Sequence, residues 1–371
     1  MRALCPVLMA LTLAIPAADL LAQTRPPARV DPLPIKKTIV DFEIMMLPTS
    51  DPLDPQQWGP VFERLGVGVQ FRQRILDDEP AVTESVRGSY RMVKGVGLLD
   101  DGGAIRFPGA KTFTLSDTKA LADWIGELQT YGAQGSPDGQ PVWGLTDQQF
   151  EKVFTALSPA VAADVEGLEF EPAIKALGLP DDYPFRLHDA AREKLRTATG
   201  VTTRPLRHEV SGLSRGTALA IVLADYGLGF RPLRTPGGAI NLVAEPLDDL
   251  AKPWPIGWPP REGEPRNHTA PALFEQITAG FDEKPLPDVL AAIEQATGTR
   301  LIIDYEDCAK RNIDPATVNV SYPQGNTAWI LIIRSVVGKA RLSRELLLDE
   351  AGTPFVHIYP FDPKREREKS R

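Results

Sequence analysis

Apolar residues recur at helical spacing twice in the first part of the chain. The two runs are Leu121, Trp124, Ile125 and Leu128, then Phe150, Val153, Phe154 and Leu157. Spacing of i, i+3, i+4, i+7 places each run on one face of a helix and predicts two amphipathic helices. Gly132 ends the first, and Thr146 with Gln149 forms a capping box at the start of the second.

Alternating apolar positions precede these helices and predict strands. The predicted elements are a strand at residues 38–47, a helix at 58–65, a strand at 67–71 and a hairpin at 89–107. The hairpin turns at Asp100-Asp101-Gly102-Gly103, because Asp-Gly and Gly-Gly adopt the positive φ angles of tight turns. Gly95 and Gly97 fall inside its first strand, where a bulge or close packing explains them. Residues 30–171 are therefore predicted to be an α+β region of unknown type.

Two later regions repeat one order of elements: strand, helix, strand, helix, strand, strand. They span residues 182–245 and 273–360. In the first, Ser214 caps a helix striped by Leu219, Val222, Leu223 and Tyr226. In the second, the last two strands turn at Asp349-Glu350-Ala351-Gly352. Both regions are predicted to be small βαβαββ-type modules, and the overall fold class is α+β with several domains.

Short sequence matches indicate that the two modules are repeats. Ala198-Thr199-Gly200 matches Ala296-Thr297-Gly298, and Gly216-Thr217-Ala218 loosely matches Asn326-Thr327-Ala328. These residues also suit helix ends, so capping chemistry alone is the alternative explanation.

Tryptophans occupy two segments without regular elements. Trp143 lies in a loop at 132–145, and Trp254 and Trp258 lie in a linker, residues 246–271, that holds seven prolines. These rings are candidate stacking platforms for a carbohydrate or a partner. The alternative is that each ring packs against a neighbouring domain.

The N-terminal residues have a pattern typical of a signal peptide. Arg2 precedes an apolar run over residues 3–18, and cleavage after Ala22 leaves a mature chain of about 350 residues. The predicted location is the periplasm or the extracellular space. No later segment is long and apolar enough to span a membrane.

Composition excludes several kinds of chemistry. The formal charge of -8 disfavours nucleic acid, and Glu366 and Glu368 dilute the basic residues of the tail at 361–371. Cys308 stands alone once Cys5 leaves with the signal peptide, as a buried side chain, or alternatively as a partner in an intermolecular disulfide or a reactive thiol. The four histidines, at 188, 208, 268 and 357, form no metal spacing, and no cofactor motif is present.

One enzymatic pattern stands out. Gly212-Leu213-Ser214-Arg215-Gly216 is a G-x-S-x-G between an extended segment and a helix, as in the nucleophile elbow of serine hydrolases. Ser214 is equally what a helix N-cap needs, and no large parallel sheet is predicted before it. Catalysis by Ser214 is the alternative, and a non-enzymatic role is the leading hypothesis.

Several positions resemble the short N-terminal domain of secretins and TonB-dependent receptors. They are Val210-Ser211-Gly212, Thr217-Ala218-Leu219 and Tyr226-Gly227-Leu228-Gly229-Phe230 in the second region, and Pro285-Leu286, Val289-Leu290 and Leu301-Ile302-Ile303 in the third. No pore or barrel sequence follows. The resemblance implies an α+β module that makes protein–protein contacts in the periplasm.

The sequence therefore predicts a binding or scaffolding protein of the bacterial cell envelope with a protein partner. Its contacts are expected at exposed strand edges, with the terminal strand of each module, near Ile240 and Val356, as the candidates. The alternatives are a serine hydrolase using Ser214 and a carbohydrate-binding protein using Trp143, Trp254 or Trp258.

Overall fold

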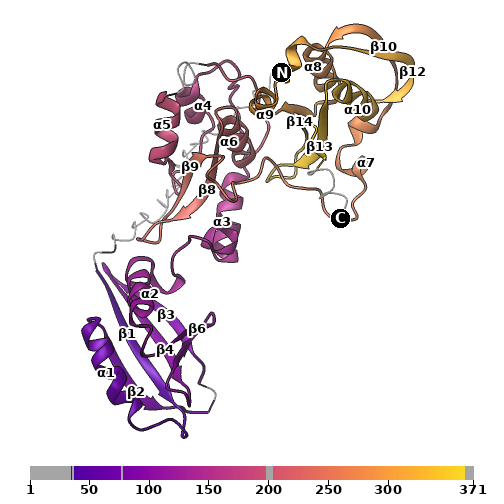
Figure 1. Cartoon of the computed structure of the whole chain (residues 1–371). Coiled ribbons are helices and arrows are strands. Elements are labelled where there is room, and N and C mark those ends of the chain that lie inside the picture. The colour runs from indigo at the N-terminus through magenta and orange to yellow at the C-terminus, as the bar shows by residue number, and fades with distance from the viewer. Residues whose placement is uncertain (1–34, 36, 77, 198–203, 364–371) are drawn as a thin grey trace, which may run out of the picture.

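Three α+β units follow one another in the computed structural model, which describes residues 35, 37–76, 78–197 and 204–363. Figure 1 shows the first unit (residues 37–134) set apart, and the second (141–246) and third (276–360) lying against each other. The mixed α+β class is confirmed. The predicted signal peptide and most of the tail lie outside the described residues.

The first unit is a sheet with two helices. Its elements are β1 (Lys37–Met46), α1 (Asp54–Arg64), β2 (Gly68–Gln73), β3 (Ala81–Arg87), β4 (Tyr90–Leu99), β5 (Ile105–Phe107), β6 (Lys111–Phe113) and α2 (Thr118–Tyr131). The strand order is β2-β1-β4-β5-β6, with β3 also paired to β4. The sequence predicted β1, α1, β2, β4, β5 and α2, but it missed β3 and β6.

Close aromatic packing accounts for Gly95 and Gly97. Phe42, Phe107 and Trp124 form a buried cluster with ring centroids 4.6 to 5.8 Å apart. A Cβ on Gly97 would lie 2.8 Å from the Phe107 ring, and one on Gly95 would lie 2.7 Å from the Phe42 ring. Of the two predicted explanations, the structure therefore supports close packing.

Two buried arginines join the first unit to the second. Arg91 donates to the carbonyls of Thr130 and Pro236, and Arg234 donates to those of Tyr131 and Gly135. Thr130 and Tyr131 end α2, where free carbonyls favour a cation. The guanidinium groups thus tie α2 to the tip of the hairpin at residues 228–246.

The second unit begins earlier than predicted. Its elements are α3 (Asp147–Leu157), α4 (Phe170–Ala176), β7 (Phe185–Leu187), α5 (Asp189–Thr197), α6 (Arg215–Ala224), β8 (Leu228–Arg234) and β9 (Ile240–Pro246). The apolar residues of α3 and α4 share one core with α6, so the predicted boundary at residue 171 is wrong. Residues 198–200 lie outside the description, and residues 204–210 form no strand.

The third unit contains two sheets. Its elements are β10 (Gln276–Pro285), α8 (Leu286–Thr297), β11 (Arg300–Ile303), α9 (Tyr305–Lys310), β12 (Asn319–Ala328), α10 (Trp329–Lys339), β13 (Leu342–Leu348) and β14 (Pro354–Pro360). One sheet pairs β10 with β12, and the other has the order β11-β14-β13. The linker before it contains the short α7 (Arg266–Thr269).

The three-stranded sheets of the last two units share one topology. In each, the last strand lies in the centre, parallel to the first and antiparallel to the one before it. The prediction of free edges near Ile240 and Val356 is therefore wrong, because β9 and β14 are paired on both sides. The match of 216–218 to 326–328 also fails, because the former begin α6 whereas the latter end β12.

Helix α6 lies between the second and third units. All residues from Gly216 to Leu223 are buried, as expected of a helix that is apolar on every side. The core around α6 includes Ile302, Leu347 and Phe355 of the third unit. The two units therefore share a core.

A search of the described residues for a helix with the length and hydropathy of a membrane span finds none.

Replacing Gly97 and Gly126 by alanine is expected to have opposite effects. Gly97→Ala forces a methyl group into the Phe107 ring and should destabilise the first unit by about 1–3 kcal/mol. Gly126 lies within α2 with nothing within 4 Å of its Cβ position, so Gly126→Ala should stabilise that unit by up to about 1 kcal/mol. Hydrogen exchange of the β4 amides measures both, and equal effects of the two variants would contradict the packing.

Candidate binding cleft

The turn between β13 and β14 docks on the N-terminus of α6. The Glu350 carboxylate accepts hydrogen bonds from the Thr217 amide at 3.0 Å, the Thr217 hydroxyl at 2.9 Å and the Trp254 indole at 2.6 Å. The Trp258 indole donates to it at 3.4 Å. A carboxylate of the third unit therefore binds where the helix dipole of the second favours negative charge.

Asp349 and Ser214 complete this contact. The Ser214 amide donates to Asp349 Oδ2 at 2.7 Å, and the Ser214 hydroxyl accepts from the Ala351 amide at 3.1 Å. Ser214 makes no side-chain cap to its own helix and is fully buried. We call this contact the latch; its residues are Asp349, Glu350, Ser214 and Thr217.

The geometry of the latch accounts for the two glycines of the G-x-S-x-G pattern. Gly212 has φ +84°, a left-handed conformation that favours glycine. A Cβ on Gly216 would lie 2.5 Å from Glu350 Oε1, so only glycine lets the carboxylate approach. Burial raises the pKa of Glu350, and its hydrogen bonds from Trp254 and Thr217 oppose that shift.

A second contact joins the units at the C-terminal end of α6. His208 Nε2 lies 3.4 Å from Asp225 Oδ1, and the His208 ring stacks on Tyr305 of the third unit at 5.1 Å. The Arg207 guanidinium lies 5.0 Å from the centroid of the same tyrosine ring. Burial raises the pKa values of Asp304 and Tyr305 beside them.

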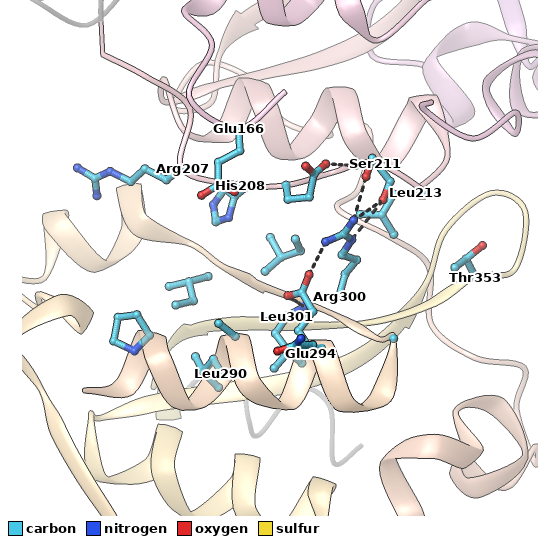
Figure 2. Close-up of a pocket in the computed structure, with 18 of the residues that line it drawn as sticks. Glu166, Arg207, His208, Ser211, Leu213, Leu290, Glu294, Arg300, Leu301 and Thr353 are labelled. Carbon is cyan, nitrogen blue, oxygen red and sulfur yellow. Dashed lines mark hydrogen bonds and ion pairs between the residues drawn. The ribbon is translucent and has the colours of Figure 1, made fainter. Parts of the chain in front are cut away.

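A cleft of about 800 Å³ opens between the two units, beside these contacts. Figure 2 shows Glu166, Arg207, His208 and Ser211 on the second unit facing Leu290, Glu294, Arg300 and Leu301 on the third. The third unit's side of the lining comes mostly from α8 and β11, with Tyr305, Thr353 and Pro354 beside them, and Leu290 and Leu301 form its floor. The cleft therefore has an apolar floor and charged walls.

The charged side chains in and beside the cleft differ in the hydrogen bonds and ion pairs that they already make within the chain. Arg300 pairs with Glu294 at 2.5 Å and donates to the carbonyl and hydroxyl oxygens of Ser211. Burial and a hydrogen bond with Asp164 raise the pKa of Glu209, while that hydrogen bond lowers the pKa of Asp164. Glu166 and Glu209 are the carboxylates that line the cleft on the second unit's side, where Arg207 lies beside them.

The tryptophans predicted as binding platforms pack together. Trp254 is 2 % exposed and lies between Trp143, stacked at 5.5 Å, and Phe230, at 5.6 Å. The Trp143 indole donates to the Lys252 carbonyl, and Trp258 meets Trp254 edge-on at 5.4 Å. Trp254 therefore has no free face, which supports the packing alternative for that ring.

The remaining candidate groups lie apart from the cleft, except His208. Cys308 is free and fully buried in α9, and burial raises the pKa of its thiol to about 12. His357 is buried in β14, His188 lies between β7 and α5, and His268 lies in α7. Within the described ranges, no three His, Cys, Asp or Glu side chains are grouped to hold a metal ion.

Comparisons of the chain with family models, with curated proteins and with solved structures find no match. The resemblance to the short secretin and receptor domain stays a prediction.

Sequence reasoning identified Ser214 and the turn at 349–352 but missed that they meet. Glu350 and Thr217 are separated by 133 positions, and no local pattern connects them. The signal that was available is the all-apolar run at 218–223, which indicates a helix buried on every side.

Gly216→Ala is expected to weaken the latch. The added methyl group meets the buried Glu350 carboxylate, so the variant should lose about 1–3 kcal/mol of stability despite alanine's higher helix propensity. Gly338→Ala is the control, because this exposed position of α10 has nothing within 4 Å of its Cβ position. Urea denaturation followed by tryptophan fluorescence measures both, and an unaffected Gly216→Ala variant would show that the latch tolerates a side chain.

A fluorophosphonate probe is expected to leave Ser214 unlabelled. The hydroxyl is fully buried and accepts from the Ala351 amide, and no described histidine is hydrogen-bonded to it. Mass spectrometry of the probe-treated chain is the measurement. Labelling that disappears in Ser214→Ala would establish the serine hydrolase alternative.

Proposed function

We propose that the chain is an exported, non-catalytic binding or scaffolding protein of the bacterial cell envelope, and that a protein partner binds in the cleft between its second and third units. The observation that carries this proposal is that both walls of the cleft are fixed before binding. The shared core around α6 and the latch hold the two walls relative to each other. Interfaces between packed units are among the preferred places for preformed ligand sites, and grooves of this kind also bind segments of partner proteins.

The alternatives draw less support from the same contacts. Ser214 is buried in the latch and Trp254 in the core, so neither group faces a substrate. Trp143 and Trp258 are half-buried, and each contacts Trp254 and donates its indole N–H to a group within the chain. The short secretin and receptor domain, which parts of the sequence resemble, implies protein–protein contact as well. A protein partner is therefore favoured over a substrate or a polysaccharide.

Two neighbouring alanines on α8 provide a matched test. Ala291 and Ala292 are both exposed. Ala291 lines the cleft, whereas Ala292 lines a separate groove of about 500 Å³ between β10 and the helices of the third unit. Ala291→Trp should fill the cleft and reduce partner recovery by about tenfold or more. Ala292→Trp should leave recovery unchanged.

The measurement is affinity capture from the native envelope with the wild-type chain and both variants, quantified by mass spectrometry. Equal thermal stability of the two variants is the control for folding. Partner loss in Ala292→Trp alone would move the site to the other groove. Full recovery with both variants would refute the cleft as the binding site.

A further inference from the structure

The floor of the cleft contains an edge strand. β11 pairs with β14 on one side, and no strand of the described chain pairs with its other side. All four residues of β11, from Arg300 to Ile303, line the cleft. An edge strand presents backbone N–H and C=O groups that can pair with another chain.

The hydrogen-bond alternation of β11 identifies the groups that face the cleft. The Asp304 amide donates to the Ile358 carbonyl at 2.8 Å. Because hydrogen bonding alternates along a strand, the Ile302 amide also points to β14, and the amides of Leu301 and Ile303 point the other way. Glu294 accepts from the Leu301 amide at 3.2 Å. The Ile303 amide therefore points away from β14, to the side of β11 that no described strand pairs with.

Two carboxylates, Glu166 and Glu209, line the opposite wall on the second unit's side, and Asp164 is hydrogen-bonded to Glu209. Arg207 of the same wall lies over the Tyr305 ring. Arg300 across the cleft is already paired with Glu294 and Ser211. A cationic side chain is thus the complement of this wall.

The floor of the cleft is apolar, so it is complemented by apolar side chains of a bound segment. Leu290, Leu301 and Pro287 give it an apolar surface beside β11. Successive side chains of a strand point to opposite faces. A strand laid along β11 would place apolar side chains on the floor and the intervening ones toward the carboxylates.

We propose that the cleft binds an extended segment of the partner protein as an added strand on β11, with a lysine or arginine of that segment reaching Glu166 and Glu209. This inference rests on the proposed function, since it specifies what the partner presents. The backbone pairing supplies affinity, and the alternation of apolar and basic residues supplies specificity.

A random peptide library displayed on phage, selected on the full chain, tests the chemistry of the segment. We expect enrichment of peptides that alternate apolar with Lys or Arg residues and lack central proline. Synthetic copies of an enriched peptide should bind the double variant Glu166→Gln, Glu209→Gln about tenfold more weakly. The control is Glu171→Gln, an exposed carboxylate of α4 that does not line the cleft.

Hydrogen exchange tests strand addition itself. The Ile303 amide should exchange about tenfold more slowly with the enriched peptide bound than without it, as expected of a newly paired strand. Ala291→Trp should abolish the peptide's binding, and Ala292→Trp should preserve it. Acidic or proline-rich enriched sequences, no enrichment at all, or an Ile303 amide that the peptide leaves unprotected would each overturn the inference.

The two proposals fail in different ways. If Ala291→Trp removes the native partner but no basic, alternating peptide protects Ile303, the cleft stands as the binding site and strand addition is refuted. If the peptide binds as expected but the native partner is recovered equally with Ala291→Trp, the strand edge accepts peptides and the proposed function is refuted.

Discussion

Burial of the Glu350 carboxylate at the start of α6 is the contact on which the arrangement of the second and third units depends. An ionised carboxyl removed from water is costly unless donors surround it, and four donors do so here. They come from α6 and from the linker, so the carboxylate is satisfied only when three separate segments meet. The apolar helix beneath it imposes the same requirement, because α6 has no face suited to water.

The shared core explains why the proline-rich linker is ordered around its tryptophans. Trp254 covers Phe230 of the second unit and donates to Glu350 of the third. Its ring contributes apolar burial and its indole N–H finds a partner, the combination that buried tryptophan requires. The segment therefore acts as part of the core and not as a flexible spacer.

The sequence predicted what local patterns determine. Helical stripes located α2, α3 and α6, and Asp-Gly and Gly-Gly turns located the β4–β5 hairpin. It failed where the decisive contact is distant. The strands near Ile240 and Val356 end their modules in sequence, yet parallel pairing with β7 and β11 places them in the centre of their sheets. Ser214 likewise looked like a cap or a nucleophile, and its actual partner is the Ala351 amide, 137 positions away.

The shape of the cleft is determined by how the second and third units dock against each other. Glu166 and Glu209 stand on one unit, and Leu290 and β11 stand on the other, so neither unit alone forms both walls. Docking and binding must then be linked, since a ligand that bridges both walls binds the docked state and not the separated one. Each contact that favours docking, from the Glu350 carboxylate to the stacking of His208 on Tyr305, therefore also raises the affinity of the cleft by keeping the competent state populated.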